Sequence, residues 1–258
     1  MEVKLLKPDH FSGEILFKNY LVKGFDSFDQ LIDLYAKYKK NNSKKSILIT
    51  LDKLDQAHYT STHAILNNDL DSTEGYDLSG IDTIAFENNE HIGYLSTPSE
   101  FFIRKENFLK QTKNIDFSNA CERGLSIETD ELQLLKEINN HPVNFLDKQI
   151  LLKIIPVERP YESICGFPNG YFYCDLNPFE NYALAKYLFD KYEYQLFGLG
   201  ASLIGFLREK PLNESQAIEL ISDLARLYNS EENIFHNLIQ CIKDTQYLFL
   251  KYTENLDL

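Results

Sequence analysis

Tryptophan is absent from this sequence, methionine occurs once, and only four cysteines occur among 258 residues. The cysteines are scattered through a chain long enough to fold around its own core, so we predict free thiols rather than disulfides. No basic leader precedes an apolar stretch at the start, and the uncharged run 196–207 is far shorter than the ~20 residues that cross a bilayer. These absences predict a cytoplasmic protein without a membrane partner.

Positive charge is also scarce, because 26 Lys and Arg face 39 Asp and Glu, which gives a formal net charge of −13. Nucleic-acid binding requires basic clusters that neutralise phosphates, so we expect no nucleic-acid partner. The scarcity is uneven: no Lys or Arg occurs from Leu54 through Ile103, and that segment holds nine Asp and Glu. Such a segment favours a basic protein partner, since complementary potentials speed encounter. The alternative is a solvated loop that only keeps the protein soluble.

The partner-binding residues that we predict lie in this one-signed segment. They are Asp69, Asp71, Glu74, Tyr76, Asp77, Asp82, Glu87 and Glu90. The polar stretch 67–79 predicts exposed loops, in which Tyr59 and Tyr76 could act as aromatic anchors inside a charged rim. The leading hypothesis is a non-enzymatic acidic binding protein, most concretely an immunity-type inhibitor that covers the active site of a basic toxin.

Aromatic residues are abundant, with 18 Phe and 16 Tyr, and supply material for a packed core. Four stretches begin with a small polar residue that is followed three residues later by Glu or Gln, which is the pattern of a helix start. They begin at Ser27, Thr97, Asn177 and Asn213. Helical spacing of apolar residues predicts further helices from Thr129 and from Ser230.

Short apolar runs predict the strands. They are 46–51, 150–155, 194–199, 202–208 and 246–252, together with a hairpin that pairs 81–86 with 92–95. The glycines of 198–205 are expected to shape a hairpin or bulge. The fold class is therefore α+β, with a mixed or antiparallel sheet flanked by helices. Near residue 150 an apolar strand-like run leads into a loop rich in Gly, Pro and aromatic residues. This change in composition predicts two parts, an N-terminal α+β region 1–150 and a C-terminal α+β domain 151–258.

The last third resembles the bacterial domain-of-unknown-function family numbered 4253. The resemblance rests on the stretch from Gly170 to Lys186, on Tyr194 to Ser202 and on Lys210-Pro-Leu212. It implies a helix, two strands, a further helix and a final aromatic strand over about residues 156–252. The family carries no established activity. Some of its members lie near toxin systems, which adds slight weight to an inhibitor role.

Two other functions remain open at this stage. The first is a hydrolase-like enzyme with a distributed site near Cys165, Asp175 and Glu180, where the helix start at Asn177 could lower the pKa of a neighbouring thiol such as Cys174. The second is a regulatory module whose aromatic loop 161–173 forms the wall of a ligand pocket. We predict no catalytic residue, metal ligand or cofactor from motifs, because Asn177 and Glu180 are explained as reciprocal caps and the glycines of 198–205 lack the Lys of a phosphate loop.

Overall fold

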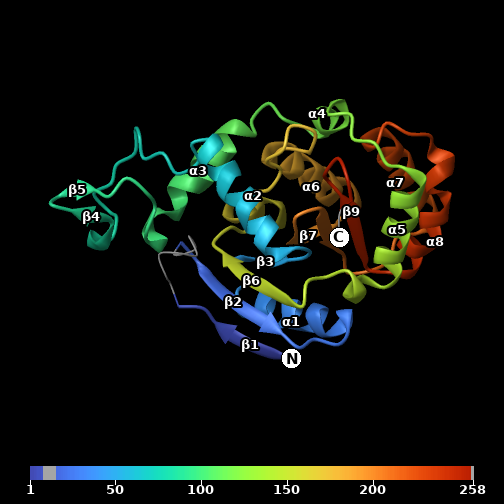
Figure 1. Cartoon of the computed structure of the whole chain (residues 1–258), viewed down its shortest axis with the longest axis horizontal. Coiled ribbons are helices and arrows are strands. Elements are labelled where there is room, and N and C mark those ends of the chain that lie inside the picture. The colour runs from blue at the N-terminus through green and yellow to red at the C-terminus, as the bar shows by residue number, and fades with distance from the viewer. Residues whose placement is uncertain (8–15, 257–258) are drawn as a thin grey trace.

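A mixed seven-stranded sheet forms the centre of the computed structural model, which describes residues 1–7 and 16–256 (Figure 1). Its strands in spatial order are β1 (Glu2–Leu5), β2 (Lys18–Lys23), β6 (Gln149–Ile155), β3 (Ser46–Thr50), β7 (Gln195–Leu199), β8 (Leu203–Leu207) and β9 (Tyr247–Lys251). Neighbours are antiparallel except β3 and β7, which are parallel. The α+β class predicted from the sequence is thus confirmed.

The helices flank this sheet. They are α1 (Phe28–Asn41), α2 (Leu54–Asn67), α3 (Phe101–Gln111), α4 (Phe117–Glu122), α5 (Thr129–Asn140), α6 (Pro178–Tyr192), α7 (Glu214–Leu227) and α8 (His236–Asp244). The described residues also include the short 3-10 segments η1 (Thr83–Ala85), η2 (Pro98–Glu100), η3 (Pro142–Asn144), η4 (Pro160–Gly166) and η5 (Glu232–Phe235). Figure 1 shows α5, α7 and α8 grouped at the end of the molecule where β9 lies.

The predicted helix starts form because side chains satisfy the first free backbone N–H groups of a helix. Ser27 accepts from the backbone of Gln30 at α1, and Asn213 and Gln216 cap each other reciprocally at α7. Asn177 forms the same box at α6. The start at Thr97 also forms its box, but the first turn is the 3-10 segment η2 before α3 continues.

The apolar runs become buried strands of the sheet, and aromatic side chains join it to a helix. All five residues of β3 are buried, as are six of the seven residues of β6. Phe28 of α1 contacts Phe197 of β7 and Phe249 of β9, with ring centroids 5.9 and 5.5 Å apart. The glycines between Gly198 and Gly205 lie in the predicted hairpin, and the β7–β8 register shifts between Leu196 and Gly198 as a bulge would shift it.

Three local predictions were wrong. Residues 81–86 are not a strand, because 83–85 form η1 and only Phe86–Glu87 pairs, with Glu90–His91 rather than 92–95. These residues lie outside the main sheet, so no long strand partner satisfies their backbone. The helix predicted from Ser230 begins as η5, and α8 starts only at His236. The helices α2 and α4 and the strands β1 and β2 were not predicted from the sequence.

Strands from both predicted parts interleave. β6, which contains residues on either side of 150, lies between β2 and β3, and β3 of the first part pairs with β7 of the second. One cluster of buried apolar residues extends from Leu16 to Leu256. The predicted parts 1–150 and 151–258 therefore share one sheet and one core. No helix within residues 1–7 and 16–256 is long and apolar enough to span a membrane.

Candidate functional site

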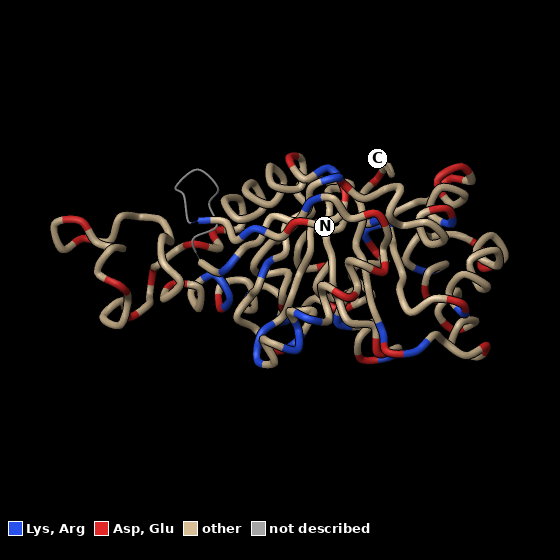
Figure 2. The backbone as a smooth tube through the Cα atoms, turned by 90° about the horizontal axis from the view of Figure 1, so that it is seen from below, with Lys and Arg blue, Asp and Glu red and all other residues tan. Residues whose placement is uncertain are grey.

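The chain between α2 and α3 carries a projecting arm, which we define as residues 74–95 and call the acidic arm. Figure 1 shows its tip, the hairpin of β4 (Phe86–Glu87) and β5 (Glu90–His91), standing well away from the sheet. Figure 2 shows acidic positions along this projection. Asp77, Asp82, Glu87 and Glu90 are all exposed, and no Lys or Arg occurs on the arm. The structure thus brings five of the predicted partner-binding carboxylates, with Glu74 at the base, onto one projection.

The tip of the acidic arm is a tight hairpin with an unfavourable charge arrangement. Asn88 and Asn89 both adopt positive φ, of 52° and 67°, as a two-residue hairpin turn requires. This turn places Glu87 directly opposite Glu90 across the strands. Like charges in directly opposite positions destabilise a strand pair. The hairpin therefore concentrates negative charge at some cost to its own stability.

Two apolar side chains accompany these charges. Ile84 is 77% exposed and Tyr94 is 53% exposed, and both lie on the acidic arm. Elsewhere on the arm, Ile81, Ala85 and Leu95 are buried and belong to the main cluster of buried apolar residues. Exposed aliphatic and aromatic groups inside a charged rim are the composition of a protein-binding surface.

A buried carboxylate holds the arm to the body. Glu100 is fully buried at the start of α3, and its Oε2 accepts hydrogen bonds from the backbone N–H groups of Ser96 and Thr97, both at 2.8 Å. Its Oε1 lies 2.7 Å from Nε2 of His91, while the Gly93 N–H donates to Nδ1 of the same ring. Burial would raise the pKa of Glu100, but these hydrogen bonds outweigh burial and lower it. Glu100 is therefore an anion, and its hydrogen bonds hold the end of the arm, from His91 to Thr97, against the start of α3.

Other predicted residues form the base of the arm instead of its exposed surface. Asp71 makes a two-bond ion pair with Arg104 of α3, with both contacts at 2.6 Å. The Tyr76 hydroxyl donates to Asn107 and accepts from Lys110, each at 2.8 Å. Asp71 is thus neutralised by a cation outside its own segment, and Tyr76 is a packing residue. Asp69 and Glu74 remain exposed near this base.

The proposed anchor Tyr59 lies elsewhere. It is on α2, where its ring contacts His63 at 4.4 Å, and His63 in turn contacts Tyr171 at 4.9 Å. Ile84 and Tyr94 are the exposed large side chains on the arm, and sequence reasoning missed both. Their position in a segment without Lys or Arg was a usable signal, but their exposure depends on the arm standing apart from the core.

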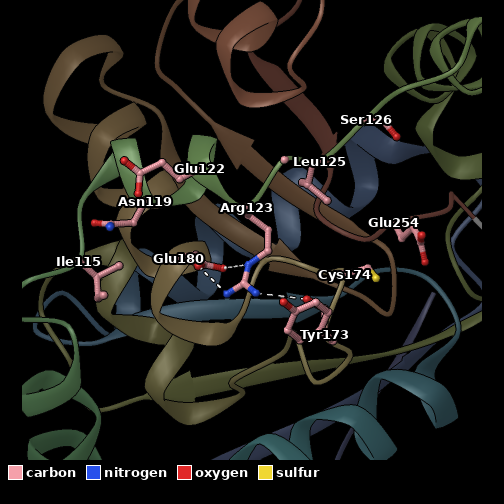
Figure 3. A pocket seen from close by; sticks show the side chains of 11 residues that line it. Ile115, Asn119, Glu122, Arg123, Leu125, Ser126, Tyr173, Cys174, Glu180 and Glu254 are labelled. Atoms are coloured by element: carbon pink, nitrogen blue, oxygen red, sulfur yellow. Dashed lines mark hydrogen bonds and ion pairs between the residues drawn. The ribbon is translucent and has the colours of Figure 1, made fainter.

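A second region contains residues of the alternative enzyme hypothesis. A cavity of about 420 Å³ is lined by Arg123, Tyr173, Cys174, Glu180 and Glu254, among others (Figure 3). Arg123 donates to both Glu180 oxygens, at 2.9 and 2.7 Å, and to the Tyr173 carbonyl. Glu180 also accepts from the Asn177 N–H at 2.8 Å, as the predicted cap requires. Arg123 and Glu180, two of the charged side chains that line this cavity, are therefore engaged with the protein itself.

The two thiols of this hypothesis are not activated. Cys165 is fully buried, and burial raises the pKa of its thiol to about 12. Cys174 is exposed, yet desolvation and the carboxylates of Glu254 and Asp175 raise the pKa of its thiol as well. A nucleophilic cysteine requires the opposite shift. The expected lowering by the start of α6 does not occur.

A third region lies at the carboxyl ends of the parallel pair β3 and β7, which the sequence reading did not single out. Asp52 is 2% exposed there and accepts from the backbone N–H groups of Ser202 and Leu203, at 2.8 and 3.1 Å. Burial, only partly offset by these hydrogen bonds, raises the pKa of Asp52 to about 6. A cavity of about 380 Å³ beside it is lined by Lys53, Phe172, Asp175 and Ser202, among others. The contacts of Asp52 show that it holds the β7–β8 turn in place.

Comparisons with known proteins do not extend this description. No family model, curated protein or solved structure matches the chain. The resemblance of residues 156–252 to an uncharacterised bacterial family therefore stays a prediction. Within the described part of the chain, no three His, Cys, Asp or Glu side chains are grouped as metal ligands would be.

Proposed function

We propose that this protein binds a basic protein partner through the acidic arm, in the manner of an immunity-type inhibitor that covers the active site of a basic toxin. The observation that carries the proposal is the pairing of Glu87 with Glu90 at the tip. Two carboxylates in opposite positions reduce hairpin stability. Departures from local stability rules tend to occur where function requires them, and a cationic partner would relieve this repulsion.

The surroundings of the tip support the same partner chemistry. Asp77 and Asp82 extend the negative charge along the arm, and Ile84 and Tyr94 offer apolar contact area. The buried Glu100 network holds the arm in one orientation, which reduces the entropy that binding must remove. Lys and Arg of a basic partner would meet the carboxylates, and its apolar groups would meet the two exposed side chains.

The compartment belongs to the same proposal. All four cysteines are free thiols in the structure. Free thiols suit the reducing cytoplasm, where an inhibitor of this kind would meet a toxin before the toxin reaches its target. These thiols support the cytoplasmic location that belongs to our proposal.

The test compares two charge-reversed baits with the unaltered protein in affinity capture from the native cell. The arm variant carries Asp82→Lys, Glu87→Lys and Glu90→Lys. The control carries Asp33→Lys, Glu209→Lys and Glu219→Lys, which are exposed carboxylates elsewhere and give the same change in net charge. We expect the unaltered and control baits to retain one basic protein that the arm variant loses, because the arm variant reverses the local field.

The captured protein must then be examined for activity. We expect it to arrest growth when expressed alone, and co-expression with the unaltered protein or the control variant to restore growth. Equal retention by the arm variant would remove the arm as the binding surface. Retention of a partner whose activity is unaffected would leave binding intact but overturn the inhibitor role.

A further inference from the structure

The two outer edges of the seven-stranded sheet differ. At one edge, the Asn139 side chain of α5 bonds both backbone groups of Phe249 in β9, donating to its carbonyl at 2.9 Å and accepting from its N–H at 2.8 Å. This contact closes the edge as a neighbouring strand would. At the other edge, β1 is outermost (Figure 1), and within residues 1–7 and 16–256 it pairs with β2 alone. An edge strand of this kind is a template for a further strand.

The register of β1 with β2 determines which of its backbone groups face outward. The N–H of Leu6 donates to the Asn19 carbonyl at 2.9 Å, and Lys4 and Glu2 follow at alternate positions opposite Leu21 and Lys23. In an antiparallel pair the backbone groups of alternate residues point to the same side. The N–H and C=O groups of Val3 and Leu5 therefore point away from the sheet.

These outward groups can bond to the same strand of a second copy in only a few registers. Within residues 1–5, an antiparallel, two-fold arrangement must bring outward-facing residues opposite each other, and pairings of three or more residues are then centred on residue 2, 3 or 4. A centre at residue 2 places Glu2 opposite Glu2 of the second copy, and a centre at residue 4 places Lys4 opposite Lys4. Both are disfavoured by like charge.

The pairing centred on Val3 is self-complementary. It places Glu2 of each copy opposite Lys4 of the other, and it places the half-exposed side chains of Met1 and Leu5, at 52% and 51%, opposite each other. On the neighbouring strand, Lys23 lies opposite Glu2, so charges alternate across the joined strands. Opposite charges and apolar pairs in directly opposite positions stabilise antiparallel strands.

We propose that this protein forms a two-fold homodimer in which the β1 strands of two copies pair antiparallel about Val3, so that one sheet runs through both copies. The occupant of the open edge is a second copy of this chain because its own sequence supplies the matching charges. The interface is independent of the acidic arm, which lies away from β1 in Figure 1.

Sedimentation equilibrium over the micromolar range tests this on residues 1–258 with no tag added before Met1. Glu2→Lys and Lys4→Glu each convert two attractive pairs into two repulsive ones, and we expect each to weaken dimerisation by about tenfold or more. The variant with both substitutions, combined with Lys23→Glu so that residue 2 keeps an opposite charge on β2, recreates the opposite-charge pairs in exchanged positions and should restore dimerisation to near the unaltered level. The side chains of Glu2 and Lys4 are exposed, so the variants should fold, and circular dichroism checks this.

Hydrogen exchange supplies a second measurement. The amides of Val3 and Leu5 should become more protected as the concentration of the unaltered protein rises, while the Leu6 amide, already bonded to Asn19, should not change. A protein that stays monomeric throughout the range would overturn the proposal. So would a dimer that is insensitive to the single reversals, or one that the triple variant does not restore, because such a dimer uses another surface.

Discussion

Asp52 is a single carboxyl group whose burial should be visible in the pH dependence of stability. Its folded-state pKa of about 6 lies above the value of an unfolded chain, so the native state keeps this proton longer. The resulting stabilisation is fully present only below the unfolded pKa of about 3.9 and is lost as the pH rises from there through the folded-state pKa of about 6. The unfolding free energy of the unaltered protein minus that of Asp52→Asn should therefore be roughly 2 kcal/mol lower at about pH 7 than at about pH 4.

Chemical denaturation at a series of pH values measures this difference. The other titrating groups are common to both proteins and cancel. Asp33→Asn is a matched control, because Asp33 is exposed on α1, and its difference from the unaltered protein should stay nearly constant with pH. A flat difference for Asp52→Asn would show that burial of this carboxyl group does not shift its titration.

The helix α7 shows how one amphipathic element joins the core. Its Ala217, Leu220, Ile221 and Leu224 are buried, as the spacing after Asn213 predicts. Leu224→Ala should lower the free energy of unfolding by about 2–5 kcal/mol, because it leaves a cavity in packed surroundings. Ile218→Ala on the same helix removes a side chain that is 51% exposed and should change stability by less than about 1 kcal/mol. Equal losses of unfolding free energy for the two variants in urea denaturation would contradict the conclusion that Leu224 faces the core and Ile218 faces solvent.

The hairpin at the tip of the acidic arm should be stabilised by a substitution that harms its proposed function. Glu90→Lys replaces a like-charged pair with an opposite pair across from Glu87, which should favour the hairpin by about 0.5–1 kcal/mol. Slower amide exchange in residues 86–91 would measure the gain, and affinity for the captured partner should fall. Glu74→Lys introduces the same charge near the base and should not slow exchange at the tip. Unchanged exchange in Glu90→Lys would mean that the repulsion is negligible.

At the scale of the whole molecule, the net charge of −13 should have opposite effects on folding and on partner binding. Self-repulsion opposes the compact state, so added salt should raise the melting temperature by screening it. The same screening should lower the association rate with a basic partner. Thermal unfolding and binding kinetics across a salt series measure both trends. A melting temperature that falls with added sodium chloride would contradict the first.

Much of the local structure could be predicted because its causes lie within a few residues. Ser27, Asn177 and Asn213 cap helices by bonding backbone groups two or three residues away, and 46–50 and 150–155 are apolar enough to be buried. The hairpin at 81–95 was misjudged because its buried residues Ile81, Ala85 and Leu95 join the main core without forming strands of the main sheet. The helix α2 was missed because the start at Lys53 has no side-chain cap and its apolar face is weak.

By itself the sequence determined the fold class, the capped helices and the absence of cations from Leu54 through Ile103. The tertiary structure decided which charges remain available, because a carboxylate is neutralised by whatever the fold places beside it. Asp71 meets Arg104, 33 residues away, whereas Glu87 and Glu90 meet each other on a projecting tip. The tertiary structure also decided that β6 lies between β2 and β3 and that β1 is left at an edge of the sheet. Contacts between distant residues depend on the packing of the whole chain, and local pattern does not specify them.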